Sequence, residues 1–145
     1  NFDSERILGL ACDCGERSNL KEKINELKQA WGGLDCVIAN VGDGRSVPDP
    51  IPESNQWSQV WHTNFETALT TARTCLPLLQ ASQGCLLFVT SITGLAVLGA
   101  PVDYSVAKTA VIAMAQNLAR KVAPTVRVNV IAPGNVFFPG GSWRY

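Results

Sequence analysis

The sequence predicts an α/β fold, a doubly wound parallel sheet with helices on both faces. Four short apolar runs, at residues 6–12, 34–39, 85–89 and 125–131, alternate with segments of helical periodicity. Uninterrupted apolar runs of this length are typical of parallel strands that helices cover on both sides. Each run leads into polar or glycine-rich sequence, and the ligands of such sheets bind beyond the carboxyl ends of the strands. The 145 residues fit a single domain.

The segment between the first two runs has the pattern of an amphipathic helix. Asn19 and Glu22 have the spacing of a capping pair at a helix N-terminus, and Gly32 marks the end. Between them lies an apolar stripe with helical spacing, opposite a face of lysine and glutamate. Its members are Leu20, Ile24, Leu27 and Trp31.

A longer helix is predicted over about residues 54–80, with Pro77 helping to close it. Its apolar stripe has one polar member, Asn64. A polar side chain on an apolar face needs hydrogen-bond partners, so Asn64 is either a satisfied structural amide or part of a functional network. The next predicted helix carries Tyr104 and Lys108 and continues towards the fourth run.

Composition and charge exclude several classes of function. The 12 basic and 12 acidic residues balance, so no attraction to nucleic acid is expected. No apolar stretch approaches the roughly 18 residues that span a bilayer, and we expect a cytoplasmic protein without a membrane partner. Five cysteines without a Cys-x-x-Cys pair, and His62 as the single histidine, predict no metal site. Cys12 and Cys14 are interpreted as small buried apolar residues, and His62 as a surface or packing residue.

Tyr104 and Lys108 form the most informative pair in the chain. Residues four apart lie on the same face of a helix, so the Lys108 ammonium is expected near the Tyr104 phenol, where it favours the phenolate. Such a phenol can exchange a proton with a carbonyl or alcohol oxygen if a second donor holds that oxygen. Ser91, at the end of the third run, supplies a hydroxyl for this role. The same spacing also arises by chance, as a half-buried tyrosine beside a solvated lysine.

Polar and glycine-rich residues at the strand ends supply the pair with a site. The carboxyl ends of neighbouring parallel strands lie along one edge of the sheet. The sequence therefore predicts a common crevice there. The residues that follow the four runs are Asp13, Asn40 and Gly42, Ser91, and Pro133 and Gly134.

Together these residues resemble the short-chain dehydrogenase/reductase family, over nearly all of the chain. Residues 39–42 resemble the Asn-Asn-Ala-Gly segment that lies along the cofactor in that family, and residues 129–134 resemble its strand and turn near the nicotinamide. The resemblance implies a Rossmann-like fold, present here in part. The residues in the places of the family's catalytic Asn, Ser, Tyr and Lys are Asn64, Ser91, Tyr104 and Lys108.

The resemblance implies an oxidoreductase that transfers hydride between NAD or NADP and a small secondary alcohol or ketone. Tyr104 is then the general acid in reduction and the base in oxidation, and Lys108 assists it and binds the nicotinamide ribose. Ser91 binds the substrate oxygen, and Asn64 holds a water of the proton relay. A homo-oligomer, dimer or tetramer, is also expected. The remaining cofactor contacts that the resemblance implies are Asp13 at the adenine ring, Asn40, Gly42, Pro133, Gly134, and the main-chain amide of Val136 at the carboxamide.

The sequence departs from the family pattern in three ways. Ala39 and Val41 replace the first Asn and the Ala of the Asn-Asn-Ala-Gly segment, and Phe138 stands where the family often has Thr. No G-x-x-x-G-x-G motif occurs, so the turn that holds the pyrophosphate is expected to be missing with its flanking strands. We therefore expect residues 1–145 to be one incomplete domain, an internal piece of a longer enzyme, that binds dinucleotide weakly or not at all by itself.

Two other interpretations remain open. Related epimerases and dehydratases of nucleotide sugars use the same Tyr-x-x-x-Lys pair, usually with a larger substrate domain after the sheet. The chain could also be a non-catalytic remnant or interaction module, in which Trp57, Trp61 and the Tyr104 helix pack against a partner.

Overall fold

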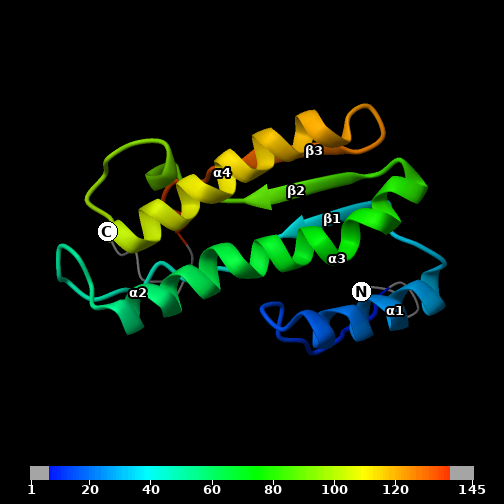
Figure 1. The fold of residues 1–145 in the computed structure, drawn as a ribbon, viewed down its shortest axis with the longest axis horizontal. Helices are drawn as coiled ribbons and strands as arrows, with labels where there is room; N and C mark the ends of the chain where they lie inside the picture. Colours follow the sequence, from blue (N-terminus) through cyan, green and yellow to red (C-terminus); the bar gives the residue numbers. More distant parts are fainter. Residues whose placement is uncertain (1–6, 138–145) are drawn as a thin grey trace.

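A three-stranded parallel sheet organises the fold in the computed structural model, which describes residues 7–137 (Figure 1). The strands are β1 (Cys36–Ala39), β2 (Cys85–Val89) and β3 (Arg127–Ile131), and they lie in that order across the sheet. Both pairings are parallel, as the alternation of apolar runs and helices predicted. All three strand ends therefore face the same edge.

The helices connect these strands and include two short irregular turns. The π-helical turn η2 lies between α2 and α3 without a break in the helical path, and the 3₁₀ turn η3 follows β2. The bounds are α1 (Arg17–Trp31), α2 (Ser54–Trp61), η2 (His62–Glu66), α3 (Thr67–Ser82), η3 (Ile92–Gly94) and α4 (Val102–Val122).

The core lies between one face of the sheet and the helices α3 and α4. Leu86 and Phe88, two residues apart on β2, point to this face and are fully buried. They form one cluster with Leu79 of α3 and Val111 of α4. Burial of one such side chain contributes about 1.5–3 kcal/mol, so this layer fixes both helices on the sheet.

The other face of the sheet is open within residues 7–137. Ile38 and Ile131 point to it and are 59% and 46% exposed. The strands take their helix contacts from α3 and α4, which cover the opposite face. Helices were predicted on both faces of the sheet. Within the described residues they cover one face only.

The first predicted strand is absent, because residues 7–12 have no regular secondary structure. A strand needs a neighbour to accept and donate its backbone hydrogen bonds. Within the described residues β1 pairs only with β2, and no strand lies between its outer edge and this segment, which joins no ladder. Arg6, the first residue of the predicted strand, lies outside the described part.

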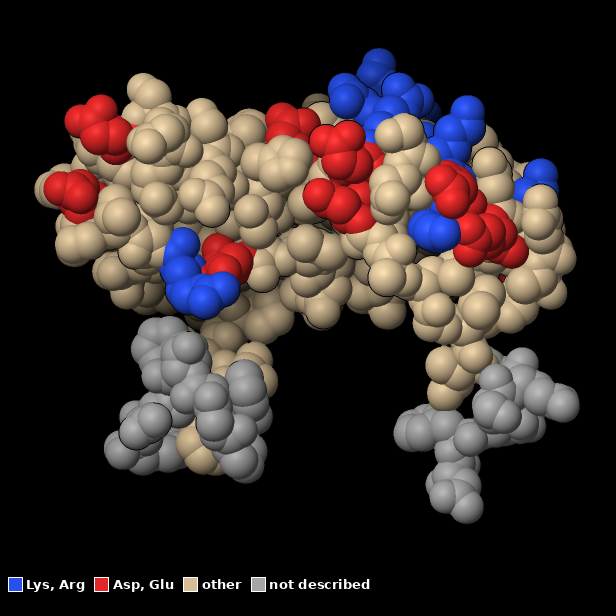
Figure 2. Space-filling view, turned by 90° about the horizontal axis from the view of Figure 1, so that it is seen from below, with Lys and Arg blue, Asp and Glu red and all other residues tan. Residues whose placement is uncertain are grey.

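The first helix forms as predicted, but its cap differs. α1 begins with Glu16 at the N-cap position and without a side-chain cap. Asn19 instead accepts a hydrogen bond from the Asp13 N–H at 3.1 Å, so the predicted capping pair is wrong. Gly32 ends the helix at a φ of 83°, as predicted. Basic and acidic side chains lie side by side at the end of the molecule where α1 lies, on the right in Figure 2.

The long helix continues past Pro77 to Ser82, so Pro77 does not close it. Leu79, two residues beyond the proline, is fully buried in the core. This packing offsets the backbone hydrogen bond that proline cannot make. Gln83, with a φ of 54°, ends the helix instead.

No helix within the described residues combines the length and apolar character that crossing a bilayer requires.

Candidate active site

The segments that follow β2 and β3 are joined beyond the carboxyl edge of the sheet. Thr90 donates to the carbonyl of Ile131 through its N–H at 2.8 Å and through its hydroxyl at 3.0 Å. The N–H of Ile92 donates to the carbonyl of Pro133 at 3.0 Å. Pro133 therefore contributes a backbone contact that holds Ser91 at this edge.

Lys108 is a buried cation at this site, with 4% of its surface exposed. Its Nζ lies 5.6 Å from the centre of the Tyr104 ring, so the two side chains share a helix face as predicted. Burial lowers the pKa of Lys108, because the charged form loses hydration. Within the described residues the Lys108 ammonium donates one long hydrogen bond, of 3.5 Å, to the carbonyl of Val89. The ammonium can therefore donate to a ligand.

Gly42 brings the backbone against two of the predicted site residues. A Cβ at this position would lie 2.7 Å from Lys108 Nζ and 3.0 Å from Asn64 Oδ1. Both distances are shorter than ordinary carbon contacts, so only glycine fits without displacing a neighbour. Gly42 therefore links Lys108 and Asn64, which are 44 positions apart in sequence (108 − 64).

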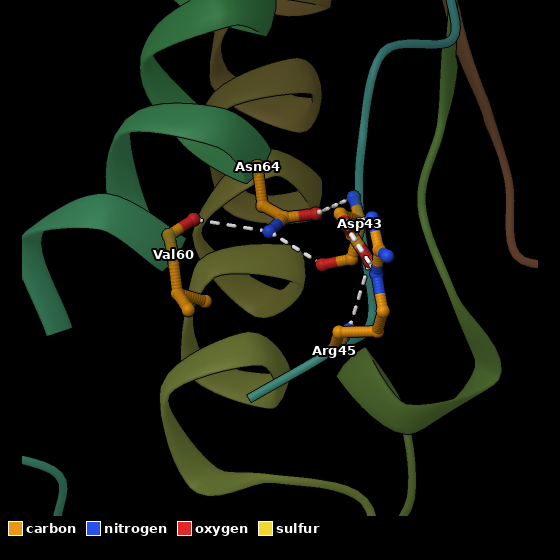
Figure 3. A network of polar contacts seen from close by, with 4 residues as sticks. All are labelled: Asp43, Arg45, Val60 and Asn64. Carbon is orange, nitrogen blue, oxygen red and sulfur yellow. Dashed lines mark hydrogen bonds and ion pairs between the residues drawn. The ribbon is translucent and has the colours of Figure 1, made fainter. Parts of the chain in front are cut away.

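Asn64 is 1% exposed and forms the centre of a polar network (Figure 3). Its Nδ2 donates to the carbonyls of Asp43 at 2.9 Å and Val60 at 3.0 Å, and its Oδ1 accepts from the Asp43 N–H at 3.0 Å. The amide thus uses both of its donor hydrogens within the protein. Arg45 holds the Asp43 carboxylate through Nε, at 2.9 and 3.0 Å, and lowers its pKa.

The helical turn that carries Asn64 is wider than an α-helix. In η2 the N–H of Thr67 bonds to the carbonyl of His62, five residues back. Single π-helical turns of this kind are found frequently at functional sites. The apolar stripe fitted an unbroken α-helix, so the sequence carried no signal for this turn.

Ser91 is 8% exposed and begins the turn η3. Its Oγ accepts hydrogen bonds from the N–H of Thr93 at 3.2 Å and from the Thr93 hydroxyl at 3.0 Å. These two donors occupy the acceptor side of the oxygen, so the proton of Ser91 is available for a ligand oxygen.

Tyr104 is half-buried in the first turn of α4, against the loop after β1. A Cβ on Gly44 would lie 3.7 Å from Cζ of the ring, which is ordinary contact. The preceding residue, Asp103, is 1% exposed and accepts a hydrogen bond from Ser46. Asp103, Ser46 and Thr93 were missed by the sequence reasoning. Asp103 could have been noticed as an acidic residue in the first helical turn, whereas nothing in the sequence marked Ser46.

The residues predicted to hold a cofactor lie in several segments. Asp13 is exposed next to α1, where its carboxylate accepts from the Gly15 N–H at 2.8 Å, and Gly15 packs against His62. No contact joins Asp13 to the group around Lys108 in the described structure. Phe138 lies outside the described residues. The exposed predicted residues at the carboxyl edge are Asn40, Gly42, Gly134 and Val136.

The parallel sheet and the helices that connect its strands place the chain among the Rossmann-like α/β proteins, with part of that fold present in the described residues. The chain belongs to the short chain dehydrogenase family, whose model matches residues 1–138.

Individual relatives agree with this assignment. The chain is 33% identical over 136 residues to cis-2,3-dihydrobiphenyl-2,3-diol dehydrogenase of Pseudomonas sp. (strain KKS102), covering 90% of this chain and 49% of that protein. The structure of NADPH-dependent 3-quinuclidinone reductase from Rhodotorula rubra superposes with a TM-score of 0.80 at 30% identity, covering 90% of this chain and 50% of that one. A short chain dehydrogenase from Leptospira borgpetersenii with bound NAD⁺ superposes with a TM-score of 0.82 at 25% identity, covering 89% and 54%. The chain thus spans about half the length of these relatives.

Proposed function

We propose that the protein is an NAD(P)-dependent oxidoreductase that interconverts a small secondary alcohol and a ketone. The observation that carries this proposal is the position of Lys108. It is buried beside Tyr104 and under Gly42, at the sheet edge where Asn64 and Ser91 also lie. The family match and the dehydrogenases and reductases among the relatives support the same reaction class.

The residues at the carboxyl edge fit a nicotinamide cofactor. Lys108 has donor capacity left for ribose hydroxyls, and the close approach at Gly42 keeps a side chain out of the space above it. NAD or NADP, when bound, supplies or accepts the hydride. We propose that the backbone after β1 and β3 holds the cofactor together with Asp13. The residues of this proposed cofactor site are Asp13, Asn40, Gly42, Tyr104, Lys108, Pro133, Gly134 and Val136.

The residues of the chain then handle the proton. In the direction of reduction, the Tyr104 phenol gives its proton to the oxygen of the ketone, and the Ser91 hydroxyl donates a hydrogen bond to the same oxygen. The Lys108 ammonium stabilises the phenolate that remains. In oxidation Tyr104 takes the proton from the alcohol. Asn64 fixes the loop after β1 and contributes to the path by which the proton is replaced.

We propose further that the protein is cytoplasmic and assembles as a homo-oligomer. Support for assembly comes from an apolar groove of about 640 Å³ between the segment 93–100 and the outer side of α4. Val97, Val102 and Val106 line it and are at least 40% exposed. The mass of the purified full-length protein by light scattering tests this proposal, and a monomer at micromolar concentration would contradict it.

The reaction is tested with the full-length protein, NADH or NADPH, and a set of cyclic and aromatic ketones. Consumption of reduced cofactor is followed by absorbance, and the reverse reaction is followed with the matching alcohols, including cis-dihydrodiols. Turnover with at least one pair is expected. If no pair reacts and a nucleotide sugar is epimerised or dehydrated instead, the protein belongs with the alternative reaction class.

A further inference from the structure

Asp103 is the one carboxylate among the described residues that is almost fully buried, at 1% exposure. Its Oδ2 accepts a 2.6 Å hydrogen bond from the Ser46 hydroxyl, and its Oδ1 accepts a 2.8 Å hydrogen bond from the N–H of Tyr104. No lysine or arginine of the described part forms an ion pair with it. A buried carboxylate is costly unless donors satisfy it, so these two hydrogen bonds and the N-terminus of α4 hold the charge.

Ser46 belongs to a loop that contacts two parts of the candidate site. At one end of this loop the Asn64 side chain binds both the N–H and the carbonyl of Asp43. At the other end Ser46 binds Asp103. Gly44, between them, packs against the ring of Tyr104. The loop 43–46 therefore connects Asn64 with the first turn of α4.

We propose that Asp103 and Ser46 are positioning residues that fix the Tyr104 phenol relative to Asn64 and Lys108. Asp103 is adjacent to Tyr104 in the chain, and its bond to Ser46 joins residues 57 apart. Loss of this bond frees the first turn of α4 to shift against the loop. The inference rests on the proposed function, because it assigns Tyr104 the proton transfer. A displacement of about 1 Å at a reacting group can reduce a rate about 100-fold.

The variants separate positioning from simple loss of a hydrogen bond. Ser46→Ala removes the donor to Asp103, whereas Ser46→Thr keeps a hydroxyl. Asp103→Asn keeps an acceptor for the Tyr104 N–H and removes the charge. Ser82→Ala is the matched control, because the Ser82 hydroxyl donates an equally short 2.6 Å bond to the carbonyl of Leu34, before β1 at the amino end of the sheet.

Two measurements on the full-length protein detect the effect of these substitutions on Tyr104. The first is kcat and KM for ketone and cofactor. The second is the ¹⁹F NMR spectrum of protein labelled with 3-fluorotyrosine, in which Tyr104→Phe identifies the Tyr104 signal. The NMR measurement needs no turnover, so it reports the position of the ring even if the proposed reaction is wrong.

We expect Ser46→Ala to lower kcat about tenfold or more, with KM for the cofactor within about twofold, and to move or split the Tyr104 signal. Asp103→Asn should act in the same direction, Ser46→Thr should restore both readouts, and Ser82→Ala should leave both near wild type. The inference is overturned if Ser46→Ala behaves like Ser82→Ala, or if kcat falls while the Tyr104 signal stays in place. If the wild type turns over no substrate, the proposed function fails. The ¹⁹F signal of Tyr104, compared between Ser46→Ala and Ser82→Ala, then decides the positioning role.

Discussion

At the level of one residue, the burial of Lys108 makes the stability of the fold depend on pH. The side chain is 4% exposed, and burial lowers its pKa from an ordinary value of 10.5. The unfolded chain therefore keeps the proton to a higher pH than the folded protein. Stability rises with pH between the two pKa values, and below the folded pKa the full cost of burying the ammonium remains.

Lys108→Met should remove this cost. We expect the variant to be more stable than the wild type at pH 7 and the difference to narrow as the pH rises towards 10.5. Urea unfolding at a series of pH values measures it. Lys121→Met, at an exposed position of the same helix, is the control. A Lys108→Met variant that is less stable than wild type at pH 7 would show that the ammonium contributes more through its contacts than its burial costs.

Gly42→Ala should disturb the site more than the fold. The added methyl group would lie 2.7 Å from Lys108 Nζ and 3.0 Å from Asn64 Oδ1, and both are ends of side chains, which can shift more easily than the backbone. We expect kcat to fall about tenfold or more, with the free energy of unfolding changed by less than about 1 kcal/mol. Gly33→Ala, where the methyl group meets no atom within 4 Å, is the matched control. Equal kcat values for the two variants would contradict the claim that the close approach at Gly42 matters for the site.

The sequence predicted some of these residues and missed others for a physical reason. Tyr104 and Lys108 could be paired because helical geometry alone places residues four apart on one face. The pair of Ser46 and Asp103 depends on how the loop after β1 meets α4, and no local pattern encodes that contact. The proximity of two side chains was therefore predictable where one helix contains both residues, and not where tertiary packing brings them together.

At the level of elements, local pattern and tertiary context determined different features. The strands β2 and β3 formed where apolar runs predicted them, since each has a neighbour in the sheet. Residues 7–12 have a similar composition but no neighbouring strand within the described residues, and they form none. The turn η2 was also unpredictable, because the apolar stripe on either side of Asn64 suits an ordinary helix.

The close approach of β1 and β2 at their amino ends gives a test at the level of elements. A Cβ on Gly84 would lie 2.4 Å from the carbonyl oxygen of Asp35, which itself accepts the Cys85 N–H at 2.9 Å. Gly84→Ala should force these backbones apart and destabilise the fold by about 1–3 kcal/mol. Chemical denaturation measures the change, with Gly9→Ala, which meets no atom within 4 Å, as the control. A loss no larger than that of the control would contradict the packing described at this junction.

For the whole molecule, the proposed acid/base group and the main binding site of a dinucleotide are predicted to lie in different parts of the full-length protein. Residues 1–145 contain the group around Tyr104 but no G-x-x-x-G-x-G motif, and they span about half the length of the relatives. In this fold such a turn supplies the helix N-terminus that binds the pyrophosphate, so we expect weak binding where the turn is missing. Motif and spacing are local properties of the chain, so this division is a prediction from the sequence alone.

We therefore expect residues 1–145 alone to bind NADH or NADPH with a Kd above about 1 mM, which corresponds to about −4 kcal/mol. Titration calorimetry or quenching of cofactor fluorescence measures it, with the full-length protein as the positive control. Sub-millimolar affinity of the 145-residue chain would show that the carboxyl edge holds the cofactor without a glycine-rich turn.

The central claim is that Tyr104 transfers the proton, and replacement of its hydroxyl tests this most directly. In Tyr104→Phe the ring and its contact with Gly44 remain, while the hydroxyl that we propose as the acid/base group is lost. The measurement is kcat/KM of the full-length protein for its ketone substrate, alongside the Kd for the cofactor. The account predicts a loss of at least about 100-fold in kcat/KM with cofactor affinity nearly unchanged. A Tyr104→Phe enzyme that keeps its activity within a few-fold of wild type would contradict it.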